Sequence, residues 1–124
     1  TLNELTRQKN TNTDGISFLS ELTGKRNQQK KHDYLYFEFP EKNGQVAIRL
    51  GDWKAVKSNM KKDKNAPWEI YNLLTDKDES NNVATQHPEL IKRFEAILKK
   101  EHQPSHITEW EFVDPKFNIL NPKQ

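Results

Sequence analysis

The feature that most constrains this chain is one amphipathic segment near its C-terminal end, HPELIKRFEAILKKEH, at residues 87–102. Its apolar residues recur every three or four positions, which is typical of a helix with one buried face. These residues are Leu90, Ile91, Phe94, Ile97 and Leu98. Pro88 suits the first turn of a helix, and Lys99 and Lys100 suit the last turn. The sequence therefore predicts a long helix whose apolar face must pack against another element.

Four short segments upstream of this helix have the composition of β-strands. Residues 34–39 are rich in aromatic side chains, and residues 45–50 alternate apolar with polar side chains. Polar turns connect them to two further strand-like segments, residues 53–57 and 68–72. Such connections are typical of an antiparallel meander. We therefore predict an α+β domain: a four-stranded antiparallel sheet packed against one long C-terminal helix, with an N-terminal linker segment and an irregular C-terminal arm.

The composition fits one small domain with long polar loops, or a piece of a larger protein. Of the 124 residues, 32% are hydrophobic and 31% are charged. No apolar run approaches the ~20 residues that a membrane span needs, and the first ten residues lack the pattern of a secretory signal. A balance of 20 basic against 18 acidic residues gives no general attraction to nucleic acid. We therefore expect neither a membrane nor a nucleic acid as a partner.

The residue types that carry chemistry form no recognisable active centre. The chain has no cysteine, which excludes thiolate nucleophiles and cysteine-bound zinc. His102 and His106 are four apart, but Pro104 between them breaks the helix that would pair them on a metal. The serines lack a G-x-S-x-G turn, and the acidic residues at 76–79 fall in a turn, where they more often cap backbone N–H groups. We therefore predict no catalytic residue and no metal site in this chain.

A basic stretch beside two tryptophans is the best candidate for a binding surface. Five lysines against one aspartate give a local charge of +4 next to Trp53 and Trp68, an arrangement that suits an anionic polymer or sugar. The lysines are Lys54, Lys57, Lys61, Lys62 and Lys64. An acidic stretch follows at residues 69–89, so a solvated strand surface of mixed charge explains the lysines as well. A stand-alone anion- or carbohydrate-binding module therefore stays open as an alternative.

Four motifs, in order and at matching spacing, resemble a known family. They are YLYFEF at residues 34–39, AIRLGDWKAVK at 47–57, EIYNLxxDxxExxNVA at 69–84, and a helix opened by His-Pro at 87–88. Together they resemble the C-terminal subdomain of the sulfatase family, which is a four-stranded antiparallel sheet packed on one long helix. The upstream TLNEL and DGISFL resemble the end of its catalytic domain and the linker that follows. The resemblance covers about residues 1–102 and is closest to bacterial arylsulfatase-type enzymes.

The resemblance implies how the chain is divided and what it belongs to. Residues 1–32 would be the end of the catalytic domain and the linker, residues 33–102 the sheet–helix subdomain, and residues 103–124 a C-terminal arm. The chain would be the C-terminal portion of a sulfuric ester hydrolase, supporting the N-terminal catalytic domain and shaping its substrate cleft. The full enzyme would act on a sulfated small molecule or sulfated glycan, in the periplasm or after secretion.

The chemistry of this family would lie outside these 124 residues. Sulfatases use a formylglycine made from Cys or Ser in a C/S-x-P-S/A-R motif, together with calcium held by carboxylates and an Asn or Gln. Neither the motif nor the ligand set occurs in this sequence. The resemblance therefore implies calcium and formylglycine for the catalytic domain, no cofactor in this chain, and no activity for the chain alone.

The resemblance also suggests residues near the substrate. In the family, the end of the first subdomain strand approaches the mouth of the sulfate pocket, which makes Glu38 a candidate for binding sugar hydroxyls. His32 and Arg49 are further candidates. The arm after Gln103 is longer than is usual in the family, and its aromatic residues are expected to contact a surface outside this chain.

Some matched residues are expected to hold the fold. We predict that Trp53 packs where the helix meets the sheet, and that Glu79 and Asn82 fasten the loop before the helix by hydrogen bonds to the backbone. We also expect Ile16, Phe18, Leu19 and residues 110–117 to make few contacts with the sheet–helix unit, or to pack against a neighbouring copy of the chain.

Overall fold

The computed structural model of the chain describes residues 1–9 and 13–114. The chain divides into a smaller unit, Thr1–Asp33, and a larger unit that begins at Tyr34. The smaller unit contains α1 (Leu2–Leu5), α2 (Leu19–Leu22) and the 3-10 turn η1 (Arg26–Gln28). The larger unit contains β1 (Leu35–Phe39), β2 (Gln45–Leu50), β3 (Trp53–Lys57), β4 (Trp68–Asn72), η2 (Ala84–Gln86), α3 (Pro88–Glu101) and η3 (Thr108–Trp110).

The larger unit is built on one antiparallel sheet with the strand order β1-β2-β3-β4. Each strand pairs with the next one along the chain, so that Tyr36 lies opposite Ile48 and Ile48 opposite Ala55. Because side chains alternate along a strand, these residues share one face of the sheet. The predicted meander and the α+β fold are confirmed.

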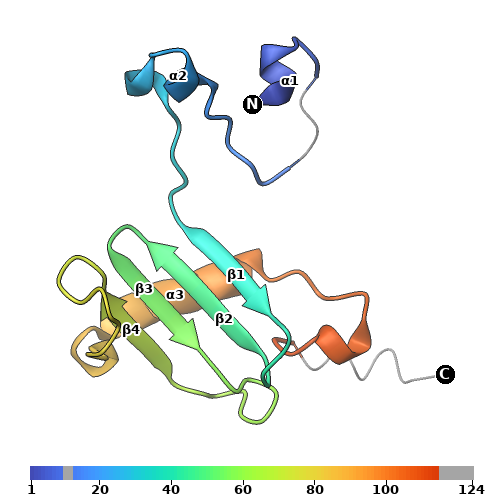
Figure 1. The fold of residues 1–124 in the computed structure, drawn as a ribbon. Helices are drawn as coiled ribbons and strands as arrows, with labels where there is room; N and C mark the ends of the chain where they lie inside the picture. The colour runs from blue at the N-terminus through green and yellow to red at the C-terminus, as the bar shows by residue number, and fades with distance from the viewer. Residues whose placement is uncertain (10–12, 115–124) are drawn as a thin grey trace. The chain divides into compact units, whose positions relative to one another are not determined.

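The helix α3 lies across one face of this sheet, as Figure 1 shows. Its residues Phe94, Ile97 and Leu98 are buried against a core that includes Ile48 and Ile70. Removing each such side chain from water contributes about 2 kcal/mol to stability. The apolar stripe predicted for this helix is therefore the part of the sequence that closes the core.

Polar contacts at the β3–β4 side fix the helix against the sheet. The carboxylate of Glu95 accepts hydrogen bonds from the Trp68 indole, at 2.7 Å, and from the Lys57 ammonium, at 3.0 Å. The buried charge of Lys57 is thereby paired, as a buried charge must be. At the start of the helix the rings of Trp53 and His87 pack with their centroids 4.9 Å apart. The predicted place of Trp53, where helix and sheet meet, is confirmed.

The loop that leads into the helix is held by Asn82. Its Oδ1 accepts hydrogen bonds from the backbone N–H groups of Ile70 and Ala84, each at 3.0 Å, and so joins β4 to η2. This confirms the predicted role of Asn82. The same prediction for Glu79 is wrong, because its carboxylate binds the ammonium of Lys54 at 2.6 Å instead of backbone N–H groups.

The described part of the C-terminal arm packs on its own subdomain. Phe112 is buried in the core, beneath the β1–β2 turn at Gly44. The ammonium of Lys61 also donates a hydrogen bond to the Glu109 carbonyl at 2.8 Å. The expectation of few contacts in this region is therefore wrong for Phe112 and Val113, and the Phe112 ring occupies the space that a side chain at Gly44 would need. Trp110 is exposed, and Phe117 lies outside the described residues.

The smaller unit is held mainly by hydrogen bonds to the backbone. The Thr1 hydroxyl oxygen accepts a hydrogen bond from the Phe18 N–H at 3.0 Å, and the Gln29 amide donates one to the Ser17 carbonyl at 2.8 Å. Four large apolar side chains of this unit are exposed: Leu2, Leu5, Phe18 and Leu22. Ile16 and Leu19 also lie in this unit and not in the core of the larger one.

Substitutions of two glycines in the larger unit can test how the arm packs. Gly44 and Gly51 both have positive φ angles, +75° and +60°, but only at Gly44 would an added Cβ lie 2.7 Å from the Phe112 ring. We expect Gly51→Ala to cost about 1 kcal/mol through backbone strain alone. Gly44→Ala should cost about 1–3 kcal/mol more, because the ring must move. Urea denaturation of both variants measures the difference, and equal costs would show that Phe112 does not pack at the turn.

Candidate functional site

The structure places two of the three predicted substrate-binding residues, Glu38 and Arg49, on opposite faces of the sheet. Glu38 lies on β1 and points to the side of the sheet that α3 covers, as its pairing with the buried Val46 requires. Arg49 lies on β2, points to the opposite face, and donates a hydrogen bond to the Gly51 carbonyl at 3.3 Å. His32 is exposed and belongs to the smaller unit. Glu38 and Arg49 therefore do not form one site, and the substrate contacts of all three residues stay predictions.

Glu38 belongs to a cluster of polar side chains beside β1. The Tyr36 hydroxyl donates a hydrogen bond to Glu38 Oε1, and Nδ1 of His102 lies 2.8 Å from the same oxygen. On the other side of the imidazole ring, Nε2 lies 3.3 Å from Oε1 of Glu111. The side chains of His102 and Glu111 are 10% and 0% exposed, and that of Glu38 is 25% exposed. The cluster thus connects β1, the end of α3 and the arm.

The buried carboxylate of Glu111 is held by three backbone donors. Its Oε2 accepts a hydrogen bond from the N–H of Ser105 at 2.9 Å. Its Oε1 accepts two more, from Val113 at 2.9 Å and from Asp114 at 2.8 Å. Such donors stabilise a carboxylate that is removed from water. Because they come from both sides of Glu111 in the sequence, their hydrogen bonds hold the arm in a compact loop around this side chain. No pattern in the sequence marked Glu111, because its partners are backbone groups of an irregular segment and a histidine beyond a proline.

The tyrosine of this cluster acts as a hydrogen-bond donor. Burial and the hydrogen bond to Glu38 raise the pKa of Tyr36 well above its usual range. The hydroxyl therefore stays protonated at neutral pH and orients the Glu38 carboxylate. Chemically, the cluster can position a carboxylate and fasten the arm, and the raised pKa of Tyr36 makes its hydroxyl a hydrogen-bond donor and a poor nucleophile.

In the acidic turn before η2, Asp76 caps backbone N–H groups, as predicted. The carboxylate of Asp76 accepts hydrogen bonds from the N–H groups of Asn81, at 2.9 Å, and Ser80, at 3.1 Å. These two bonds lower the pKa of Asp76 below the usual range for aspartate. Within residues 1–9 and 13–114, no group of three or more His, Cys, Asp or Glu side chains is placed to hold a metal ion.

The lysines of the basic stretch do not share one free surface. The ammonium of Lys54 binds Glu79, while Lys57 lies on the opposite face of the sheet and binds Glu95. Lys61 is exposed and donates a hydrogen bond to the Glu109 carbonyl of the arm, and Lys62 and Lys64 are exposed. The structure therefore gives the anion-binding alternative no continuous cationic patch.

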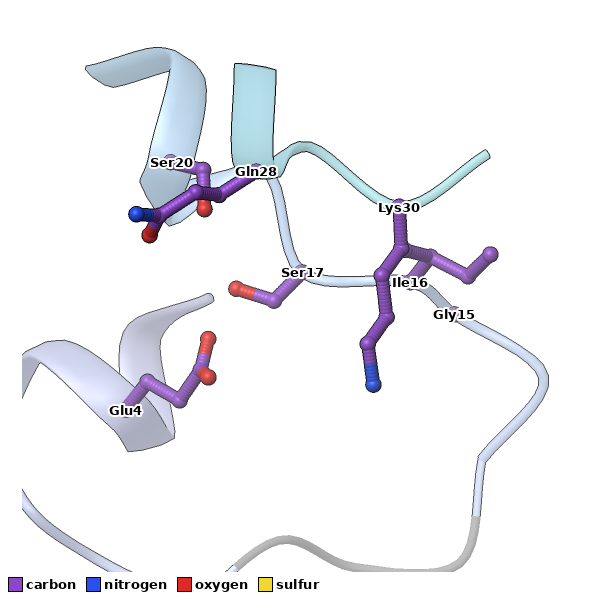
Figure 2. Close-up of a pocket in the computed structure, with 7 residues that line it drawn as sticks. All are labelled: Glu4, Gly15, Ile16, Ser17, Ser20, Gln28 and Lys30. Carbon is purple, nitrogen blue, oxygen red and sulfur yellow. The ribbon is translucent and has the colours of Figure 1, made fainter. Parts of the chain in front are cut away.

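The smaller unit has a pocket of about 300 Å³. It is lined by Glu4, Gly15, Ile16, Ser17, Ser20, Gln28 and Lys30, and Figure 2 shows the Glu4 carboxylate and the Ser17 hydroxyl pointing toward one another. One carboxylate, one ammonium group and neutral polar groups give the pocket no net charge that would select an anion. The pocket suggests no reaction, because its lining contains no histidine and, among the described residues, no hydrogen bond joins the Glu4 carboxylate to Ser17 or Ser20.

His102 tests the polar cluster, with His106 as the matched control. We expect His102→Ala to lower the free energy of unfolding by about 1–3 kcal/mol, since Glu38 loses a hydrogen-bond partner and the imidazole beside Glu111 leaves a cavity. His106 is exposed, so His106→Ala should change it by less than about 0.5 kcal/mol. Urea denaturation measures both. Two variants of equal stability would show that the cluster does not hold the arm.

Asp76 gives the fold an acid-sensitive turn. Because its pKa is lowered in the folded state, its contribution is present above the usual pKa of aspartate and is lost as the pH falls through the folded-state pKa. We expect an NMR titration of the Asp76 carboxyl to show this lowered midpoint. Ser80→Pro, which removes both the backbone N–H and the hydroxyl that Ser80 donates to this carboxylate, should raise the midpoint. An unchanged midpoint would mean that these hydrogen bonds do not form in solution.

Comparisons with known proteins give structural neighbours. No protein-family model matches the sequence, and no curated protein matches it. A putative sulfatase from Bacteroides thetaiotaomicron matches over 81% of this chain and 22% of its own, with a TM-score of 0.66 and 21% identity. A 2-O GAG sulfatase matches over 94% of this chain and 26% of its own, with a TM-score of 0.65 and 22% identity.

A third similar structure was solved with its substrate, D-glucosamine-2-N,6-O-disulfate. It matches over 100% of this chain and 24% of its own, with a TM-score of 0.54 and 20% identity. The chain therefore spans about a quarter of the length of these structures. Within the described residues, no helix is long and apolar enough to cross a membrane. The chain has a sulfatase-like fold.

Proposed function

We propose that this chain is the C-terminal portion of a sulfatase, a sulfuric ester hydrolase, and that it supports an upstream catalytic domain and shapes its substrate cleft. The observation that carries the proposal is the structural match, which covers 80–100% of this chain but only 22–26% of each sulfatase. Three quarters of such a protein thus has no counterpart here. The order of the four sequence motifs supports the same assignment.

In this proposal the chain is divided as the sequence motifs suggest. Residues 1–32 end the catalytic domain and form the linker, residues 33–102 are the sheet–helix subdomain, and residues 103–124 are the arm. The division after Asp33 in the structure supports the first of these boundaries. The burial of Phe112 makes the first part of the arm an integral piece of the subdomain core.

Hydrolysis belongs, in this proposal, to the upstream catalytic domain. The family's formylglycine and calcium have no matching motif in the sequence, and no described cluster of side chains fits a metal ion. The polar groups beside β1 instead hold the arm. We expect the 124-residue chain alone to be inactive.

The substrate class that we propose is a sulfated glycan, with a sulfated small molecule as the simpler form. Support comes from the similar structures, one described as a 2-O GAG sulfatase and one solved with a disulfated glucosamine. Glu38 is the first candidate for contact with such a substrate, because its carboxylate is partly exposed and is oriented by Tyr36 and His102. His32 and Arg49 are further candidates. We propose a periplasmic or secreted enzyme.

The experiment begins with the gene upstream of Thr1. We expect a C/S-x-P-S/A-R motif several hundred residues earlier, and we expect the long polypeptide to hydrolyse an aryl sulfate or a sulfated disaccharide. Replacing the Cys or Ser of that motif with Ala is the matched control and should abolish activity. The 124-residue chain should show no hydrolysis above buffer. Activity of the isolated chain, or an unrelated upstream sequence, would contradict the proposal.

A further inference from the structure

The strand β1 has the reverse of the polarity expected for a strand on the surface of a core. Its side chains that face α3 are Tyr36 and Glu38, both polar. Its side chains that face away are Leu35, Phe37 and Phe39, which are 38%, 58% and 45% exposed. A sheet with one face in water normally places apolar side chains inward and polar ones outward. In β1 the apolar side chains point outward, so three large apolar side chains are exposed on the face of the sheet that α3 does not cover.

The apolar surface continues from β1 onto the next two strands. The register places Phe37 opposite Ala47, and Ala47 opposite Val56, on the same face. We call Leu35, Phe37, Phe39, Ala47 and Val56 the outer strip. Contiguous apolar patches of this kind are rare on the free surface of a soluble protein and mark contact surfaces.

The polar groups that border the outer strip have partners within the chain, including Arg49, whose guanidinium donates a hydrogen bond to the Gly51 carbonyl. On the same face, Lys54 binds Glu79 at 2.6 Å. The Tyr71 hydroxyl donates a hydrogen bond to Glu69 at 2.6 Å, which raises the pKa of Tyr71 to about 12. An apolar centre with a polar rim whose hydrogen bonds are satisfied is the usual anatomy of a protein–protein interface. The face therefore fits a protein surface better than a charged ligand.

We propose that the outer strip, centred on Phe37, is the surface on which the catalytic portion of the same sulfatase polypeptide docks. This inference rests on the proposed function, since that portion is the occupant. Two observations favour it over a second copy of this chain. About three quarters of the length of each similar sulfatase has no counterpart here. The strand that carries most of the strip is also the one that directly follows Asp33, where the segment resembling the catalytic-domain end leaves off.

The absence of cysteine from this chain allows a direct test. A single cysteine is introduced as Phe37→Cys or Phe39→Cys in the strip, and as Leu74→Cys for the control, which is also exposed but follows β4 in a turn. Each variant is made in the 124-residue chain and in the polypeptide that includes the upstream sequence. The rate of maleimide labelling is then measured at the introduced cysteine by mass spectrometry of its peptide.

We expect cysteines at 37 and 39 to label rapidly in the short chain and at least about tenfold more slowly in the long polypeptide, because a docked surface must open before it reacts. The cysteine at 74 should label at similar rates in both. Equal labelling of the strip in the two forms would overturn the inference.

Slow labelling at 37 and 39 in the short chain would also overturn it. A rate that falls with protein concentration would then identify a second copy as the occupant, and a rate independent of concentration would identify another segment of the same chain. These results differ from a failure of the proposed function, which the upstream sequence and the activity of the long polypeptide report separately.

Discussion

The fold depends above all on the burial of one helix face against one face of a four-stranded sheet. Phe94 is fully buried at the centre of this contact, between the strands and the rest of α3. Two further segments of the larger unit are arranged around this contact. The turn η2 leads into the helix, and the arm returns from the end of the helix to the β1–β2 turn. With only 32% hydrophobic residues, the chain has little apolar surface to spare for a second core.

Polar contacts determine how the edges of this core are closed. At one side Glu95 pairs the buried charge of Lys57 and also accepts the hydrogen bond of Trp68. At the other side His102 lies between the carboxylates of Glu38 and Glu111. In both places a side chain from α3, or from the residue directly after it, satisfies polar groups of the sheet. The apolar face of the helix therefore supplies stability, and the polar residues at its edges fix its orientation on the sheet.

The sequence predicted the elements with strong periodicity and missed the contacts between distant polar residues. The helix and the four strands follow from local patterns, and Asn82 and Trp53 were placed correctly because their motif fixes their surroundings. Glu79 was misplaced because its partner, Lys54, is 25 residues away in the sequence. The Glu38–His102 pair, 64 residues apart, was invisible for the same reason. Phe112 was expected outside the core because an irregular segment has no period that reports which side chains are buried.

The reversed polarity of β1 has a consequence for how the strand finds its register. A shift of one residue would turn Leu35, Phe37 and Phe39 toward α3 and move Tyr36 and Glu38 into water. Hydrophobicity alone favours that shifted pairing, so the correct alignment depends on the hydrogen bonds of Tyr36 and Glu38 and on the imidazole of His102. Because His102 directly follows α3, the register of β1 is coupled to the position of the helix end: a displacement of that end would remove a contact that distinguishes the observed pairing from the shifted one.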